Sequence, residues 1–222
     1  MKATLRSPYA WLLAGLLGTA LVVPCVEGVR AGAVVLHLLS AAVLAAAVGA
    51  VAGRGRHVLV ALALALPTVA LSAVELSVRG PRLATARYAL LTAFFAYTAL
   101  VVLADVLRRG RVTGEKICGA VCVLLLIGGT WASAYLTLLQ LSPGAIRFPS
   151  SEAAGVAGPY HWLIGDVLYF SFITLTTLGY GDIVPVSPVA RAMAWLEATM
   201  GQLYLAILVA RLVGAHIAQG EA

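Results

Sequence analysis

Charged residues are scarce in this sequence. Only 11% of its 222 residues are Asp, Glu, Lys or Arg, whereas 62% are hydrophobic and the mean hydropathy is +0.99. A soluble domain carries about 25% charged residues. Because a soluble core could not hide this much apolar surface, the composition argues against a soluble protein and predicts that lipid surrounds most of the chain.

Metal-ligating and catalytic residues are scarce as well. The four histidines are scattered, and there are only three cysteines. Cys118 and Cys122 lie four residues apart and share one predicted helical face, but no nearby His, Asp or third Cys completes a metal site. No catalytic cluster is visible in the sequence. We therefore expect neither an enzyme nor a resident cofactor.

The chain is nevertheless basic, with a formal net charge of +6. In a soluble protein this excess would indicate a nucleic-acid partner. Here most of the cations lie at the ends of apolar runs, which is typical of residues that flank a membrane. We expect the partner to be the lipid bilayer and no nucleic acid to bind.

Six segments are apolar enough to cross a bilayer, which takes about 20 residues. They run approximately over 9–26, 32–52, 57–78, 84–107, 116–141 and 189–213. The first resembles a signal peptide, with Lys2 and Arg6 before it, but the stretch 22–25 lacks the small residues of a cleavage site. We favour a retained span and predict an all-α membrane protein.

Lys and Arg in short loops indicate the orientation of these spans. With the N-terminus inside, nine would lie in the cytoplasm: Lys2, Arg6, Arg54, Arg56, Arg108, Arg109, Arg111, Lys116 and Arg211. Six would lie outside: Arg30, Arg79, Arg82, Arg87, Arg147 and Arg191. The bias predicts a multi-pass protein of the cell membrane with both termini in the cytoplasm.

The connection between the fifth and sixth spans differs from the other connections. Residues 142–160 are rich in Pro, Gly and Ser and are expected to form an exposed loop. An apolar stretch of about a dozen residues follows, from Asp166 to Thr177, and is too short to cross. We expect a re-entrant helix with Asp166 favoring its N-terminus. Non-helical backbone at membrane depth is tolerated only when buried or lining water, so Gly179-Tyr180-Gly181 should line a path.

Residues 177–182 read Thr-Leu-Gly-Tyr-Gly-Asp. A dehydrated potassium ion must exchange water oxygens for protein oxygens at little net cost, which rings of backbone carbonyls achieve. The required backbone angles are those that glycine reaches without strain. The motif predicts a selectivity filter of Thr177, Leu178, Gly179, Tyr180 and Gly181, with K⁺ as permeant ligand at the first four. The Thr177 hydroxyl can serve as the innermost ligand.

Residues 166–185 resemble the pore segment of the tetrameric potassium channel family. The matching positions are Asp166, Tyr169, Phe170, Thr176, Thr177, Leu178, Gly179, Tyr180, Gly181, Asp182 and Pro185. The resemblance covers roughly the last hundred residues. It covers the first hundred only as a generic four-span bundle, as in six-span bacterial members of the family. Leu178 stands where valine is usual, and Tyr169-Phe170 where tryptophans are frequent.

The resemblance implies roles for residues around the filter. Four identical strands complete each ring of oxygens, so we expect a homotetramer. Tyr180 is expected to wedge the strand against Tyr169 and Phe170, and Tyr169 to donate to Asp182. The residues expected to support the filter are Thr176, Asp182, Tyr169 and Glu197. Of these, Glu197 is expected to form a hydrogen bond to the short helix. Gly201 would act as a hinge or allow close packing, and Gln202 would face the cavity or form an interhelical bond.

The first half of the chain lacks the arginine array of a voltage sensor. We divide the chain into a degenerate, voltage-sensor-like bundle over 1–110 and a pore domain over 111–222 with an outer helix, pore helix, filter and inner helix. The fourth span carries only Arg87, which could form an ion pair with Glu75 or Glu27. Near the end of that span, Asp105 could form a salt bridge with Arg109. We expect weak voltage dependence, because steep gating uses about three to four charges per subunit. About eight residues follow the sixth span, so any ligand gating would use the membrane domain, lipid or a separate protein.

The predicted function is a potassium-selective channel pore subunit. Three alternatives stay open on the sequence. Leu178 leaves room for a weakly selective monovalent cation channel, and the subunit could be non-conducting and regulatory. A transporter or membrane enzyme would need polar residues through several spans, which the first four spans almost lack.

Overall fold

In the part of the chain that the structure describes, the fold is all-α apart from one pair of two-residue strands. The computed structural model describes residues 8–26, 32–52, 55–75, 77, 80–108, 113–149 and 164–220. Its long helices are α1 (Pro8–Val26), α2 (Gly32–Val51), α3 (Arg56–Glu75), α4 (Pro81–Val106), α5 (Gly114–Leu141) and α8 (Pro188–Gly220). The short helix α7 (Ile164–Leu175) and the strands β1 (Ile146–Arg147) and β2 (Val184–Pro185) lie between α5 and α8.

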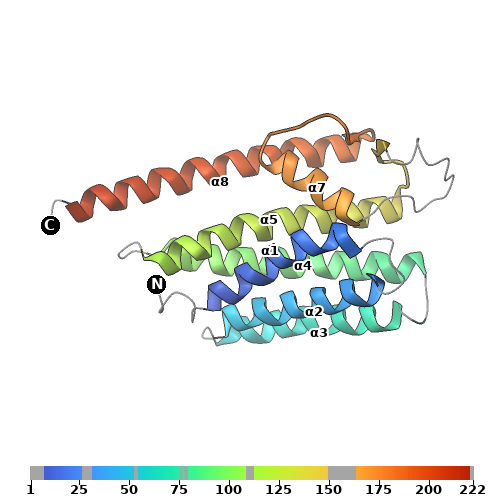
Figure 1. Cartoon of the computed structure of the whole chain (residues 1–222), viewed down its shortest axis with the longest axis horizontal. Coiled ribbons are helices and arrows are strands. Elements are labelled where there is room, and N and C mark those ends of the chain that lie inside the picture. Colours follow the sequence, from blue (N-terminus) through green and yellow to red (C-terminus); the bar gives the residue numbers. More distant parts are fainter. Residues whose placement is uncertain are drawn as a thin grey trace.

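Among the described residues, six helices are long and apolar enough, by length and composition, to cross a membrane. They correspond to the six predicted spans, and the chain is a multi-pass membrane protein. Figure 1 shows the long helices extended along the long axis, with α7 placed between α5 and α8 near one end. Helix α1 begins and α8 ends at the opposite end of the molecule (Figure 1).

Helix α8 is longer than predicted. It continues to Gly220 instead of ending near residue 213, so most of the residues expected to follow the sixth span are helical. The reason is local: no proline follows Pro188 in this segment, and a single glycine such as Gly214 is tolerated inside a helix. Its start is defined by Ser187, whose hydroxyl accepts a hydrogen bond from Ala190 N at 3.1 Å, and by Pro188 in the first turn.

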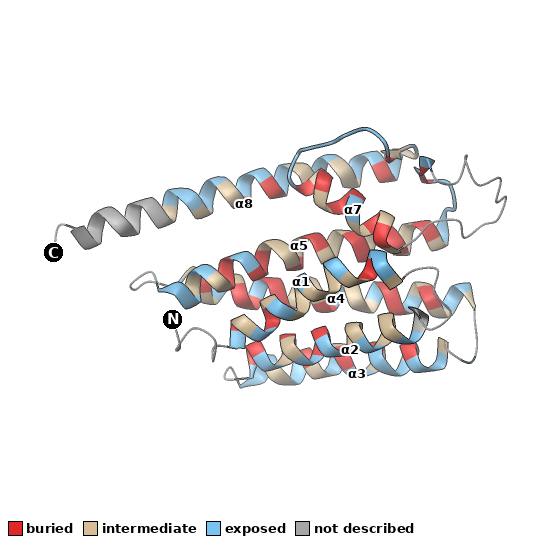
Figure 2. Ribbon diagram, in the orientation of Figure 1, coloured by how far each residue is buried: buried red, intermediate tan, exposed pale blue. Residues whose placement is uncertain are grey.

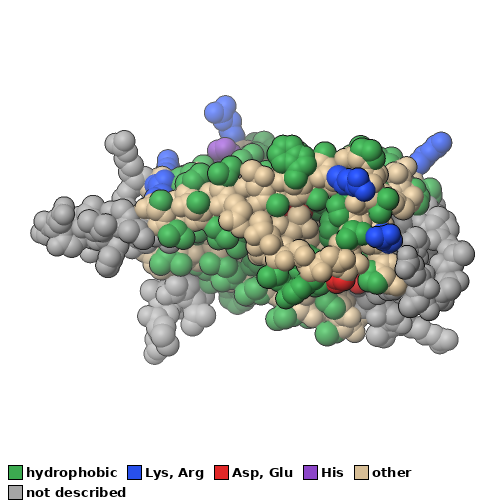
Figure 3. All heavy atoms as spheres, turned by 90° about the horizontal axis from the view of Figure 1, so that it is seen from above, with side chains coloured by type: hydrophobic (Ala, Val, Ile, Leu, Met, Phe, Trp, Pro, Cys, Tyr) green, Lys and Arg blue, Asp and Glu red, His purple; other side chains and the backbone are tan. Residues whose placement is uncertain are grey.

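Apolar side chains cover the outer faces of the helices. Leu21, Leu38, Leu59, Leu66 and Leu100 are each more than three-fifths exposed. Figure 2 shows buried residues where helices face one another and exposed residues along the outside, including much of α8. On the face in Figure 3, hydrophobic side chains lie across the middle and basic side chains toward the ends of the long axis. This distribution fits a lipid solvent, in which exposed leucine costs nothing.

Two buried clusters hold the helices together. The larger joins the bundle to α5 and α8 through residues that include Leu12, Leu44, Ala61, Phe94, Val123 and Tyr204. The smaller surrounds α7 and includes Tyr135, Phe148, Val167, Phe170 and Ala190. Helix α5 contributes to both, so it links the first four helices to the segment that carries the filter motif.

Polar contacts join α1 and α8 to the end of α4. Asp105 accepts a hydrogen bond from Tyr9 OH at 2.5 Å. Arg109, the expected partner of Asp105, lies outside the described residues. Glu27, one of the two expected partners of Arg87, lies outside them as well. Arg211 on α8 donates to the carbonyl oxygens of Leu107 and Arg108, the latter at 3.1 Å. A cation at a helix C-terminus satisfies carbonyls that have no partner within the helix, so this contact ties α8 to the end of α4.

The described part of the loop predicted over 142–160 is not wholly exposed. Residues 142–149 are described, and residues 150–160 lie outside the described residues. Ala145, Ile146 and Phe148 are buried. Strand β1 pairs antiparallel with β2, and the carbonyl of Ala145 accepts hydrogen bonds from Val186 N and Ser187 N at 2.9 and 3.1 Å. These bonds hold the two ends of the 146–185 segment together beside the start of α8. The prediction failed because local composition does not reveal a partner strand that lies about forty residues away.

Candidate functional site

Helix α7 ends in a Schellman motif formed by the predicted filter residues. Thr177 N donates to Thr174 O at 2.9 Å, and Leu178 N donates to Ile173 O at 2.8 Å. Thr177 has φ +58° and is the only non-glycine residue with positive φ in the described part of the chain. This left-handed position normally carries glycine, and a threonine there costs about 1 kcal/mol. The helix therefore ends two residues before the predicted limit at Thr177.

The turn that follows is an exposed run of unpaired carbonyls. Residues 176–182 are all exposed. Gly179 and Gly181 have φ +51° and +81°, the region that the sequence analysis required of them. In the described part of the chain, no residue donates a hydrogen bond to the carbonyl oxygens of residues 177–181. Such a run needs an external partner, which is water or a cation.

Two side chains hold the start of this turn. The Thr177 hydroxyl donates to Thr176 O at 2.7 Å and accepts a hydrogen bond from Gln202 Nε2 at 2.8 Å. The Thr176 hydroxyl donates to Phe172 O at 2.7 Å, inside α7. Gln202 on α8 therefore contacts this turn directly, and its hydrogen bond fixes the rotamer of Thr177, the threonine with the left-handed backbone.

Tyr169 and Asp182 are hydrogen-bonded across the turn. The Tyr169 hydroxyl donates to Asp182 Oδ2 at 2.8 Å, as anticipated from the sequence. This bond favours the ionised carboxylate, so it lowers the pKa of Asp182. The same bond is the main cause that raises the pKa of Tyr169. It links α7 to the far end of the turn, thirteen residues along the chain.

Phe170 packs against α5. It is buried, and its ring lies edge-on to that of Tyr135, with ring centroids 5.0 Å apart. Phe170 therefore anchors α7 to α5. Tyr180 is 69% exposed in the single chain, and its expected packing against Tyr169 and Phe170 stays a prediction.

Glu197 lies at the junction of three helices and is fully buried. Its Oε1 lies 2.6 Å from Ser171 Oγ on α7, and its Oε2 accepts a hydrogen bond from Tyr135 OH on α5 at 2.8 Å. The expected bond between Glu197 and the short helix is thus present. Ser171 Oγ also lies 2.9 Å from the carbonyl oxygen of Gly128 on α5. One carboxyl group therefore joins α5, α7 and α8 behind the turn.

The number of protons in this network depends on the charge of Glu197. Ser171 has one hydroxyl hydrogen but two acceptors, and the Gly128 carbonyl can only accept. If Glu197 carries a proton, it donates to Ser171, which donates to Gly128, while Tyr135 donates to the second carboxyl oxygen. Three contacts then have three protons. An ionised carboxylate would leave one contact without a proton and an unpaired charge in a low-dielectric interior, which is costly.

Gly201 allows α8 to approach the end of α7. A Cβ atom at this position would overlap the carbonyl oxygen of Leu175 and come within 3.0 Å of its Cδ1. Because the first obstacle is backbone, no side-chain rotation could relieve it. The geometry accounts for Gly201 by close packing, one of the two roles expected from the sequence.

The structure gathers most predicted site residues around the end of α7. Thr176, Thr177, Gln202 and Gly201 meet at that end, Tyr169 and Asp182 clasp the turn, and Glu197 lies behind it. Their functional roles stay predictions.

Sequence reasoning missed Ser171, Tyr135 and Gly128. A serine inside an otherwise apolar short helix was the available signal for Ser171. At Gly128 an added Cβ would lie 2.5 Å from the Phe172 ring, so the glycine allows a close approach that no local pattern reveals.

The site offers main-chain oxygens and no cluster of metal-ligating side chains. Among the described residues, no group of three or more His, Cys, Asp or Glu is placed to hold a metal ion. What the turn can supply is a row of neutral carbonyl dipoles, which are ligands that a monovalent cation can bind.

Comparison with known proteins supports an ion channel. Residues 120–216, somewhat less than half of the chain, match the family described as "Ion channel". "Two pore potassium channel c" of Oryza sativa subsp. japonica is 40% identical over 57 residues, which are 26% of this chain and 12% of that protein. "Inward rectifier potassium channel Kirbac3.1" of Paramagnetospirillum magnetotacticum is 43% identical over 42 residues, 19% of this chain and 14% of that protein.

A third relative is similar over a longer stretch. "Protein LctB" of Geobacillus stearothermophilus is 37% identical over 76 residues, which are 34% of this chain and 54% of that protein. The chain therefore spans about half of this relative and a much smaller share of the other two. No solved structure matches the chain significantly. The likeness is confined to part of the chain, and the matched family region contains α7, the turn and most of α8.

The proton count at Glu197 predicts different outcomes for two substitutions. In Glu197→Gln, the amide can donate to Ser171 and accept from Tyr135, so all three contacts keep a proton and the thermal unfolding midpoint should stay close to that of the parent. Glu197→Ala leaves both hydroxyls without their partner in a buried site and should lower the free energy of unfolding by about 3 kcal/mol. Equal destabilisation by Gln and Ala would show that the working form is the ionised carboxylate.

Gly201→Ala tests the close approach of α8 to α7. The added methyl group must displace backbone, so the free energy of unfolding should fall by about 2 kcal/mol. Gly49→Ala on α2 is the matched control, because an added Cβ there meets nothing within 4 Å and alanine favours a helix. Thermal unfolding of the two variants in the same detergent checks this, and a Gly201→Ala midpoint equal to that of Gly49→Ala contradicts it.

The bond between Tyr169 and Asp182 predicts a pH dependence. Because the folded pKa of Asp182 is lowered, the stabilisation by this bond is present above the ordinary value of about 4 and is lost as pH falls through the folded value. Tyr169→Phe removes the donor, so Asp182 should titrate at a higher pH than in the parent. Carbon NMR of labelled aspartate measures this, with Tyr97→Phe on α4 as control. An unshifted midpoint in Tyr169→Phe would rule the coupling out.

Proposed function

We propose that the chain is the pore-forming subunit of a potassium-selective, homotetrameric channel of the six-span bacterial type. The observation that carries the proposal is the run of unpaired carbonyls over residues 177–181 at the end of α7. Main-chain oxygens in such a run can replace the hydration shell of K⁺ at little net cost. The motif, its glycines in left-handed conformations and the local similarity to potassium channels agree in supporting this filter.

A single chain cannot surround an ion with four sets of carbonyls, so the proposal requires four copies around an axis. The exposure of α8 supports this requirement. Only 11% of the most apolar stretch of α8 is buried in one chain, compared with 44% of the corresponding stretch of α5. Trp195, Leu203 and Ile207 are each more than half exposed on α8. In the tetramer these faces would pack against neighbouring copies and line the inner cavity.

The short helix would act as the re-entrant pore helix. Its C-terminal end carries the partial negative charge of the helix dipole, and Thr176 at that end adjoins Gln202 through Thr177. This charge would stabilise a cation that enters the cavity. Glu197, Ser171 and Tyr135 would brace the pore helix, while Tyr169 and Asp182 would brace the outer end of the filter. Leu178 contributes only its carbonyl, so leucine in place of valine is compatible with selectivity.

The first four helices would form a bundle that does not sense voltage strongly. Arg87 on α4 is buried and its Nε lies 2.5 Å from Glu75 Oε2 on α3. From Tyr88 to Ala104 the helix has no cation. An isolated charge that is neutralised by its neighbour moves little net charge through the field. We therefore retain the division into a bundle over 1–110 and a pore domain over 111–222, with the gating partner unidentified.

The proposed orientation has both termini in the cytoplasm of the cell membrane. Many of the cations that support it lie outside the described residues, namely Lys2, Arg6, Arg30, Arg54, Arg79, Arg109 and Arg111. Among described residues, Arg108, Lys116 and Arg211 gather at one end, where Lys116 Nζ donates to Arg108 O at 2.9 Å. The filter turn would then open to the outside.

Reconstitution in liposomes tests the proposed function. The purified protein should carry a K⁺ flux that barium blocks, with a reversal potential in mixed K⁺ and Na⁺ set by K⁺. Gly179→Ala should abolish the flux, because alanine is strained at φ +51°. Leu178→Val is the matched control and should preserve both flux and selectivity. Native mass spectrometry should give four copies for all three proteins.

The possible results discriminate between the proposed functions. Equal permeability to K⁺ and Na⁺ would replace the proposal by a weakly selective cation channel. A folded tetramer without flux would favour a regulatory subunit. A protein that is not four-fold would contradict the filter itself, because the rings of oxygens could not close.

A further inference from the structure

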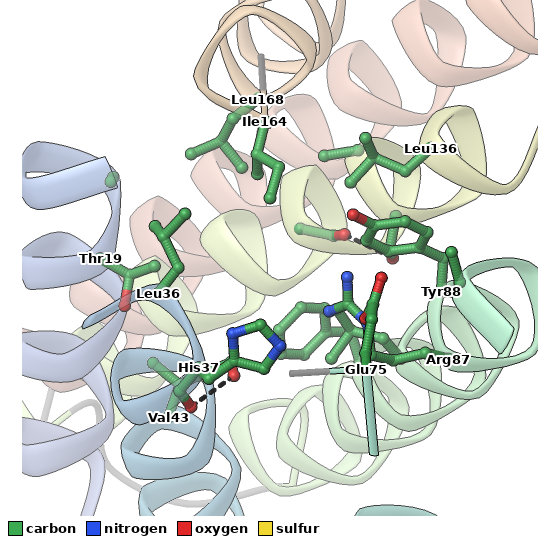
Figure 4. Close-up of a pocket in the computed structure, with 18 of the residues that line it drawn as sticks. Thr19, Leu36, His37, Val43, Glu75, Arg87, Tyr88, Leu136, Ile164 and Leu168 are labelled. Atoms are coloured by element: carbon green, nitrogen blue, oxygen red, sulfur yellow. Dashed lines mark hydrogen bonds and ion pairs between the residues drawn. The ribbon is translucent and has the colours of Figure 1, made fainter. Parts of the chain in front are cut away.

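A cavity of about 580 Å³ lies between the four-helix bundle and the pore half of the chain. Its wall combines residues of α1 to α5 with Ile164, Leu168 and Phe172 of α7. Figure 4 shows Glu75 and Arg87 side by side in this wall, with Leu168 and Ile164 on one side and His37 and Leu36 on another. The volume is within the range of about 300–1,000 Å³ that is typical of small-molecule sites.

One buried polar atom of this wall lacks a partner. Within the described residues, Gln140 Oε1 forms no hydrogen bond, whereas Arg87 Nε and Glu75 Oε2 lie 2.5 Å apart and form an ion pair with each other. A polar group left without a partner in an apolar interior costs about 1–3 kcal/mol, so the Gln140 amide is a candidate to bind a polar occupant of the cavity.

Arg87 also presents donors to the cavity. Its side chain is nine-tenths buried, and its guanidinium lies over the Tyr88 ring at 4.1 Å. In the described part of the chain its terminal nitrogens donate to no residue, and they are not among the fully buried atoms that lack partners. They are therefore accessible within the cavity and can donate to a carbonyl or hydroxyl oxygen.

The charge of the wall selects the head group of the occupant. Glu75 and Arg87 are the only charged lining residues among those described, and they neutralise each other. An anionic or cationic head would leave a net charge in a low-dielectric interior. An uncharged head that both donates and accepts fits better, because it can accept from Arg87 and pair with the Gln140 amide. The remaining lining is largely apolar and fits an alkyl chain.

We propose that the cavity is a binding site for an uncharged amphiphile of the monoacylglycerol class, with its hydroxyl and ester head near Arg87 and Gln140 and its alkyl chain along α7 and α1. The site lies beside spans that face lipid, so such a molecule reaches it from the bilayer. It is distinct from the carbonyl turn, which lies beyond the C-terminal end of α7.

Photolabelling in lipid nanodiscs tests the site. The probe is a monoacylglycerol that carries a diazirine in its alkyl chain, and labelled peptides are identified by mass spectrometry. Labels should concentrate on α1, α2 and α7, with competition by unlabelled monoacylglycerol. Ala132→Phe fills the cavity from α5 and should reduce labelling about tenfold. Leu100→Phe on the exposed face of α4 is the matched control and should leave labelling unchanged.

A second variant separates head recognition from shape. Gln140→Leu keeps the volume but removes the amide, so labelling by the monoacylglycerol probe should fall about fivefold, while an alkane diazirine without a head should be unaffected. This variant decides the test if Ala132→Phe does not assemble. The proposal is overturned if labels spread over the lipid-facing surface, if the two variants match the control, or if a fatty-acid carboxylate probe labels more strongly than the uncharged one. Because no flux is measured, this outcome is independent of the proposed conduction.

Discussion

Backbone carbonyls that lie near a membrane and lack an internal partner must find one elsewhere, and this requirement governs the segment from α5 to α8. Among the residues that the structure describes, none donates to the five consecutive carbonyl oxygens of the turn after α7, and the turn adopts left-handed backbone angles at Thr177, Gly179 and Gly181. Such a turn is stable only if its surroundings hold it firmly and if water or a cation completes its bonding. The contacts around α7 supply this support for the turn.

Helix α7 is held from three sides. Glu197 joins it to α5 and α8 through Ser171 and Tyr135, and Gly201 lets α8 reach its C-terminal end. These contacts have little freedom, because they consist of a fully buried carboxyl group and a backbone-to-backbone approach. Because the short helix is held rigidly, the start of the turn that follows it is held in place as well. The same arrangement makes the turn sensitive to movements of α8, since Gln202 bonds directly to Thr177.

The first four helices and the segment from α5 to α8 share a core but leave a partly polar space between them. The ion pair of Arg87 and Glu75 lies in the wall of this space, where the Arg87 guanidinium also lies over the Tyr88 ring. A charge pair in this position would contribute little to voltage sensing and is costly for stability alone. An uncharged lipid-like occupant would explain why the pair is placed at the cavity. The first four helices would then serve as a site for a membrane-derived ligand and not as a voltage sensor.

The six spans, the short helix and the glycine turn were determined by the sequence alone, because span length, hydropathy and the conformational freedom of glycine are local properties. Partner choice was decided only by tertiary structure. Glu197 meets Ser171 and Tyr135, which are 26 and 62 residues away, and Asp105 accepts a hydrogen bond from Tyr9, which is 96 residues away. Local patterns carry no information on which helices become neighbours, and a hydrogen bond depends on distances of a few tenths of an ångström between them.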